Sequence, residues 1–137
     1  MNSLQDLNTD TNILIVGLGV IGGGYASALS KKGYRVRCIT KEQKDIDYAL
    51  ERGMIASGST EVDAETVGAA DLIIFALYPH IFVNWIKQYQ HLFQSGTLIT
   101  DVTGVKGCVV DEVQKILRED VEFIAAHPMA GRERSGV

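Results

Sequence analysis

Cysteine is scarce in this sequence, whose 137 residues include only Cys38 and Cys108. Neither residue belongs to a CxxC pair, so the chain lacks the spacing of a cysteine zinc site and the number of thiols that a disulfide framework needs. We expect both side chains to be buried free thiols in a reducing compartment. The small number of cysteines and their lack of pairing predict a cytoplasmic protein.

Long hydrophobic runs are also missing. The longest apolar stretch, Ile13–Ile21, is interrupted by glycines and is far shorter than the roughly 20 residues that cross a bilayer. Residues 1–11 are polar and have no basic start, which predicts a short frayed tail and not a signal peptide. The remaining residues, 12–137, are expected to form one domain.

Basic clusters are absent as well. The 13 Lys and Arg residues are scattered among 17 Asp and Glu residues, and the formal net charge is -4. Such a chain offers no footprint for a nucleic-acid backbone or an anionic membrane surface, so we expect neither as a partner. A hydrophobic content of 46% is typical of a globular domain with a single core.

Short β-branched runs alternate with stretches of helical period, a pattern that predicts an α/β fold of the Rossmann type with a doubly wound parallel sheet. Strands are expected at Ile13–Val16, Tyr34–Ile39, near Ile55 and Ala56, and at Leu72–Ala76, Thr97–Asp101 and Val121–Ala126. Helices are expected from the glycine turn to Gly33, from a Thr40 to Gln43 capping box to Arg52, and at Glu65–Ala69, Phe82–Phe93 and Lys106–Leu117.

The glycines Gly17, Gly19 and Gly22 form a GxGxxG that follows the first strand directly and opens a helix. In a dinucleotide-binding turn, the first glycine makes the tight turn, the second admits the pyrophosphate and the third lets the helix pack on the strand. The alternative is a plain tight turn. The pattern favours a dinucleotide site that includes the intervening residues Leu18, Val20 and Ile21.

The end of the second strand holds Thr40 and Lys41 where the NAD form of this motif has an acidic residue. A hydroxyl and an ammonium group repel no 2′-phosphate, so NADP is favoured over NAD as the cofactor. Two alternatives stay open: Thr40 serves only as a helix cap, or the nearby Glu42 takes the acidic role.

Further polar candidates follow the later strands: Tyr78, Pro79, Asp101, Thr103 and His127. The carboxyl ends of parallel strands share one edge of the sheet, so these residues are expected to join the glycine turn in one crevice. His127, facing a nicotinamide there, is a candidate general base. No metal-ligand spacing and no serine nucleophile motif is present, and the remaining histidines, His80 and His91, are interpreted as surface residues.

Three segments resemble prephenate and arogenate dehydrogenases: Ile15-Val-Gly-Leu-Gly-Val-Ile-Gly-Gly, Thr100-Asp-Val-Thr-Gly-Val-Lys-Gly and His127-Pro-Met-Ala-Gly-Arg-Glu-Arg-Ser-Gly-Val. The resemblance runs from about Asn12 to Val137, which is the nucleotide-binding domain of that family. It implies a C-terminal helical domain in a full-length parent, which forms a homodimer and completes the substrate pocket. The isolated chain is then expected to be inactive.

The resemblance implies oxidative decarboxylation of a small-molecule substrate, giving 4-hydroxyphenylpyruvate from prephenate or tyrosine from arogenate. His127 matches the histidine that accepts the proton of the substrate hydroxyl, and Glu133 matches an acidic residue near the pocket entrance. Three positions depart from the family: Thr103 and Gly104 replace a Gly-Ser pair, Tyr78 replaces a small residue or proline, and Thr40 replaces the acidic ribose ligand. Thr103 is therefore a candidate for both substrate and cofactor contacts.

Two other functional classes remain as alternatives. A dinucleotide-sensing Rossmann domain would bind the cofactor without chemistry, and another small dehydrogenase or imine reductase would share the first domain only. The segment that begins at His127 argues against the sensor, and neither alternative requires both of the later segments quoted above.

Overall fold

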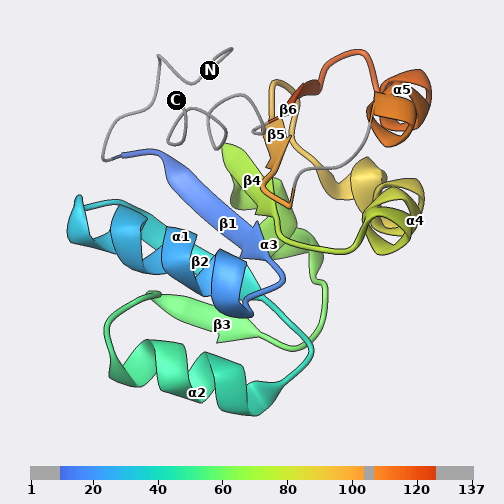
Figure 1. Cartoon of the computed structure of the whole chain (residues 1–137). Coiled ribbons are helices and arrows are strands. Elements are labelled where there is room, and N and C mark those ends of the chain that lie inside the picture. Colours follow the sequence, from blue (N-terminus) through green and yellow to red (C-terminus); the bar gives the residue numbers. More distant parts are fainter. Residues whose placement is uncertain (1–9, 104–106, 126–137) are drawn as a thin grey trace, which may run out of the picture.

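The central sheet determines the architecture of the chain. The computed structural model describes residues 10–103 and 107–125. Within these residues six parallel strands form one sheet in the order β3-β2-β1-β4-β5-β6. The chain starts in the middle of the sheet, builds outward to β3, returns to β4 and builds outward to β6 (Figure 1). The predicted Rossmann-type fold is confirmed.

The elements follow one another with short connections. In chain order they are β1 (Asn12–Val16), α1 (Val20–Lys31), β2 (Arg35–Ile39), α2 (Gln43–Glu51), β3 (Ser57–Ser59), α3 (Ala64–Ala69), β4 (Leu72–Phe75), α4 (Pro79–Tyr89), η2 (Gln90–Leu92), β5 (Leu98–Asp101), α5 (Gly107–Ile116) and β6 (Glu122–Ala125). Among these described helices none is long and apolar enough to cross a membrane.

The core lies on both faces of the sheet, because successive side chains of a strand point to opposite faces. In β1, Ile13 and Ile15 pack on the face that α1 and α2 cover, whereas Leu14 and Val16 pack on the face that α3, α4 and α5 cover. Figure 1 shows α4 and α5 side by side on the second face. The continuous apolar sequence of β1 thus reflects a strand buried on both faces.

Most predicted helix boundaries and faces agree with the structure. The helix α1 ends before Gly33, which adopts a positive φ of 96°, and Tyr34 N–H bonds back to the carbonyl of Leu29. The helix expected at Phe82–Phe93 is present as α4 and η2, and its residues Trp85 and Ile86 are buried. The helix α4 begins at Pro79 and not at the predicted Phe82. Proline is accommodated in the first turn of a helix because the N–H groups there have no partner within the helix, so the missing N–H of Pro79 costs no hydrogen bond.

The third strand was predicted two residues too early. It lies at Ser57–Ser59, and the buried Ile55 belongs to the connection before it. A β-carbon on Gly58 would lie 2.8 Å from Cγ2 of Ile46 and 3.1 Å from the Cys38 sulfur, so α2 and β2 approach this edge strand too closely for a larger residue. An apolar pattern therefore could not locate a strand made of serine and glycine.

The capping box predicted at Thr40 and Gln43 is wrong. The N-cap of α2 is Glu42, whose side chain makes no capping bond, and the amide of Gln43 bonds to Asp47 within the helix. The hydroxyl oxygen of Thr40 instead accepts a hydrogen bond from the backbone N–H of Leu18, at 3.2 Å. Thr40 therefore braces the glycine turn, 22 residues earlier in the chain.

The two cysteines are both free, as predicted, but only Cys38 is buried. Cys108 is exposed on α5, which corrects the expectation of two buried thiols. Burial raises the pKa of the Cys38 thiol to about 11, and the nearby carboxylate of Asp45 acts in the same direction. Cys38 is therefore a protonated core side chain at neutral pH.

Candidate functional site

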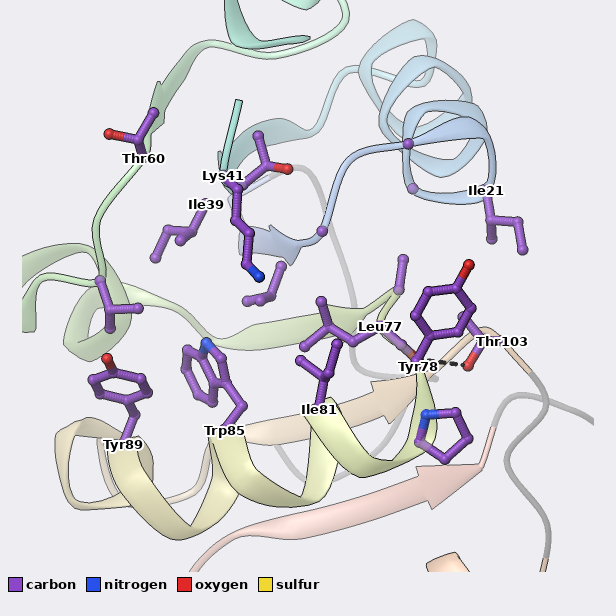
Figure 2. Close-up of a pocket in the computed structure, with 18 of the residues that line it drawn as sticks. Ile21, Ile39, Lys41, Thr60, Leu77, Tyr78, Ile81, Trp85, Tyr89 and Thr103 are labelled. Atoms are coloured by element: carbon purple, nitrogen blue, oxygen red, sulfur yellow. Dashed lines mark hydrogen bonds between the residues drawn. The ribbon is translucent and has the colours of Figure 1, made fainter. Parts of the chain in front are cut away.

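A cleft of about 990 Å³ lies at the carboxyl edge of the sheet, between the glycine turn and α4 (Figure 2). This edge is where the strand order reverses between β1 and β4, the place where open α/β sheets bind ligands. The cleft is lined by Val16, Gly17, Gly19, Val20, Ile21, Gly22, Ile39, Thr40, Lys41, Thr60, Glu61, Val62, Ala76, Leu77, Tyr78, Pro79, Ile81, Trp85, Tyr89 and Thr103.

The glycine turn forms the middle of the cleft. Gly17 adopts a φ of 90°, which favours glycine, and its N–H bonds to the carbonyl of Ile39 at the end of β2. A β-carbon on Gly22 would lie 2.1 Å from the carbonyl oxygen of Gly17, so any larger residue there would push α1 away from the turn. The sequence therefore needs glycine at both positions for backbone reasons.

The first turn of α1 gives this part of the cleft its electrostatic character. Its amide groups have no partners within the helix and carry the positive end of the helix dipole. The N-cap Gly19 has no side chain to cap them, and the first turn contains no acidic residue. Val20, Ile21 and Gly22 all line the cleft, so the amides face a space suited to a phosphate.

The end of β2 forms one side of the cleft with Thr40 and Lys41. Because the Thr40 oxygen already accepts from the N–H of Leu18, its hydroxyl hydrogen remains available to a ligand. The Lys41 side chain is exposed and points into the cleft toward α4 (Figure 2), and it makes no ion pair with any described residue. Glu42 does not line the cleft.

Sequence analysis missed the loop after β3, which adds Thr60, Glu61 and Val62 to this side of the cleft. A serine turn shapes the loop: Ser59 Oγ accepts from the N–H of Glu61 at 3.0 Å and donates to its carbonyl at 2.8 Å. Glu61 is an exposed carboxylate on the same side of the cleft as Thr40 and Lys41. Only a correct placement of β3 could have pointed to it.

The wall opposite Lys41 is the apolar face of α4, formed by Ile81, Trp85 and Tyr89 (Figure 2). The indole of Trp85 packs edge-on against Phe75, with ring centroids 5.0 Å apart, and is 8% exposed. Trp85 belongs to the core cluster on this face of the sheet, Tyr89 packs against that cluster, and both also line the cleft. A flat apolar wall of this kind suits a purine base.

The opposite end of the cleft holds Tyr78, Pro79 and Thr103. Tyr78 is 74% exposed at the N-terminus of α4, and Thr103 follows β5. Asp101 is 1% exposed and does not line the cleft, but its carboxylate accepts a hydrogen bond from the Thr103 hydroxyl. Leu18 is also buried and does not line the cleft, and its N–H is bonded to the Thr40 hydroxyl oxygen.

Two predicted site residues, His127 and Glu133, lie outside the described residues. The other histidines, His80 and His91, are exposed and do not line the cleft, as expected for surface residues. Asp120, whose pKa the Arg118 hydrogen bond holds below its usual value, also lies away from the cleft. The candidate general base, His127, is therefore not among the described residues that line the cleft.

The shape of the cleft fits a dinucleotide. Backbone amide groups of the glycine turn and the first turn of α1 lie at its centre, where a pyrophosphate needs hydrogen-bond donors. The position of these amides depends on the close approach of α1 to the glycine turn, which a β-carbon at Gly22 would prevent. Apolar surfaces lie on either side of this centre, at Ile39 with Trp85 and at Ile21 with Pro79. A cofactor with one base at each end of a charged bridge matches this order.

The family model for the prephenate dehydrogenase nucleotide-binding domain matches residues 25–137. The chain belongs to this family. The match begins just after the glycine turn, but the prephenate dehydrogenase of Bacillus subtilis (strain 168) aligns with 100% of the chain, at 32% identity over 139 positions. That of Lactococcus lactis subsp. cremoris (strain MG1363) is 29% identical and covers 91% of the chain.

A solved relative shares the fold as well. The crystal structure of prephenate dehydrogenase from A. aeolicus, in complex with hydroxyphenyl propionate and NAD+, has a TM-score of 0.74 and 25% identity, and covers 88% of this chain and 42% of that chain. The present chain spans 36% of the length of both curated relatives. Family membership thus identifies a nucleotide-binding domain, the part of these enzymes that the chain represents.

Proposed function

We propose that residues 12–137 form the domain that binds NADP or NAD in a prephenate or arogenate dehydrogenase. The observation that carries this proposal is the cleft at the switch point of the sheet, with the glycine turn at its centre. The pyrophosphate would lie on the first turn of α1, the adenosine beside Lys41 and the α4 wall, and the nicotinamide beside Tyr78 and Thr103. The A. aeolicus relative, which was crystallised with NAD+, supports a nicotinamide cofactor.

We propose NADP as the preferred cofactor. The support comes from Lys41, which points into the cleft at the adenosine end, and from the free hydrogen of Thr40. Glu61 on the neighbouring loop works against a 2′-phosphate, but it is exposed, where solvent weakens its repulsion. One charge-assisted contact contributes about 1.5 to 3 kcal/mol, or roughly tenfold or more in affinity.

Calorimetric titration of the chain with NADP+ and NAD+ tests this preference. We expect NADP+ to bind at least tenfold more tightly, and Lys41→Gln to remove most of the difference while leaving NAD+ affinity within twofold. The matched control is Lys44→Gln, a nearby exposed lysine of α2 that does not line the cleft. Equal binding of the two nucleotides by the unmodified chain would refute the preference.

We propose oxidative decarboxylation as the reaction of the full-length parent. When bound, the nicotinamide supplies the two-electron acceptor for the substrate ring as it loses carbon dioxide. The chain's own contribution would be His127, which takes the proton of the substrate hydroxyl, and Glu133 at the pocket entrance. The resemblance of the segment that begins at His127 supports these roles, and the relatives' names support the substrate class.

The choice between prephenate and arogenate, and the homodimer, belong to the full-length parent. We propose that a C-terminal helical domain supplies the dimer contacts and the groups that read the substrate side chain. A steady-state assay of the parent with both substrates and both cofactors tests the proposal. We expect turnover of at least one substrate, and no measurable turnover by the 137-residue chain, because orientation of reactants accounts for about 7 to 11 kcal/mol of a barrier. Rapid turnover by the 137-residue chain would contradict the proposal that a second domain supplies the groups that orient the substrate.

A further inference from the structure

The hydroxyl of Thr103 lies at the cleft edge, where the segment after β5 meets the loop between β4 and α4. Its Oγ1 is 2.8 Å from Oδ1 of Asp101, at the end of β5, and 3.1 Å from the carbonyl oxygen of Leu77, in the loop between β4 and α4. Figure 2 shows the bond to the Leu77 carbonyl, with Thr103 beside Tyr78 at the cleft edge. Thr103 is half-buried, lines the cleft and is held from two directions.

This geometry determines what the hydroxyl can offer to a ligand. A threonine hydroxyl has one hydrogen to donate and two lone pairs with which to accept. The Leu77 carbonyl oxygen and Oδ1 of Asp101 are both acceptors of this hydroxyl, so its single hydrogen is directed into the protein toward one of them. The side of the oxygen that faces the cleft therefore presents a lone pair, and a ligand group that meets it must be a donor.

We propose that Thr103 accepts a hydrogen bond from the carboxamide NH₂ of the nicotinamide ring and so fixes the orientation of that ring in the cleft. The inference rests on the proposed function, because the nicotinamide end of the cleft is the end that holds Thr103. The carboxamide is the donor that a nicotinamide carries on its ring. This assigns Thr103 to the cofactor, whereas the sequence left it between cofactor and substrate.

The test compares NAD+ with 3-acetylpyridine adenine dinucleotide, in which a methyl group replaces the carboxamide NH₂. The two molecules have identical adenosine halves, so any preference for a 2′-phosphate does not enter the comparison. We expect the unmodified chain to bind NAD+ about 2- to 10-fold more tightly than the analogue in calorimetric titrations, the effect of one neutral hydrogen bond.

Two variants assign this difference to the hydroxyl. Thr103→Val keeps the shape but not the oxygen, and it should weaken NAD+ binding until the two affinities are equal. Thr103→Ser keeps the hydroxyl and should keep the ratio. ADP-ribose, which lacks the nicotinamide, should bind the unmodified chain and the valine variant alike, and this control shows that the valine variant is folded.

The outcomes separate the inference from the proposed function. If the unmodified chain does not discriminate between NAD+ and the analogue, or if Thr103→Val discriminates as well as Thr103 does, the inference is wrong and dinucleotide binding stands. If the unmodified chain binds neither NAD+ nor ADP-ribose, the proposed function fails, and the inference fails with it.

Discussion

Replacing Gly22 with alanine is the perturbation whose effect the structure defines most sharply. The new β-carbon would lie 2.1 Å from the carbonyl oxygen of Gly17 and 3.4 Å from the β-carbon of Ala76. The β-carbon is bonded directly to the Cα of residue 22, and the Gly17 oxygen is a backbone atom. No side-chain rotation can therefore relieve the contact. The first turn of α1 and the glycine turn must separate by about 1 Å to reach ordinary contact distance.

The separation should cost both stability and binding. Overpacking of this kind costs about 1 to 3 kcal/mol, which exceeds the gain of roughly 0.5 to 1 kcal/mol from replacing a helical glycine with alanine. The melting temperature should fall by several degrees, at about 3 to 5 °C per kcal/mol for a chain of this size. Displaced amides would lose at least one bond to the pyrophosphate, or about tenfold or more in affinity.

A matched control lies two residues further along the same helix. A β-carbon on Gly24 would meet no atom within 4 Å, so Gly24→Ala should raise the melting temperature and leave binding unchanged. Thermal unfolding by circular dichroism and calorimetric titration with NAD+ measure both effects. If Gly22→Ala binds NAD+ as tightly as Gly24→Ala does, the glycine turn does not hold the pyrophosphate and the reasoning fails.

Three other predictions concern His127 and the cysteines. In the full-length parent, His127→Asn should lower turnover about 10²- to 10⁴-fold and abolish the acid limb of the pH profile, with cofactor affinity nearly unchanged. Steady-state kinetics and calorimetric titration measure these effects. If affinity and rate fall in parallel, the role of His127 is structural. Because burial raises the pKa of Cys38 from 9.0 to about 11, the unfolded thiol ionises first, so the free energy of unfolding should fall as pH rises from about 9 to 11. Urea unfolding at these pH values should show a smaller decline for Cys38→Ala, and an identical decline in both proteins would contradict the buried, protonated thiol. A thiol reagent should modify the exposed Cys108 in the folded chain and Cys38 only after unfolding.

Much of the fold could be predicted from the sequence because it depends on local patterns. The apolar residues of β1 and β4 are contiguous in the chain, and Gly33 and Gly53 each lie two residues after the end of a helix. The third strand was misplaced because its position depends on backbone pairing with β2 and on the close approach of Ile46 to Gly58. Neither the backbone pairing nor the close approach produces a pattern of apolar residues in the sequence.

The polar details of the cleft were harder to predict, because they join residues far apart in the chain. The bond from the Leu18 N–H to Thr40 spans 22 residues, and that from Thr103 to Leu77 spans 26 residues. A local interpretation assigned Thr40 to the following helix, where a capping motif is common. Glu61 follows β3, whereas the motif places its acidic residue at the end of the second strand, so the motif does not indicate Glu61.

The central claim is that the cleft holds a nicotinamide dinucleotide with its pyrophosphate on the first turn of α1. The most direct test is a crystal structure of the chain at a saturating concentration of NADP+. We expect the pyrophosphate between Gly17 and Gly22, the adenosine between Lys41 and Trp85, and the nicotinamide beside Thr103. A dinucleotide bound elsewhere, a reversed orientation, or a cleft that remains empty at saturation would contradict it.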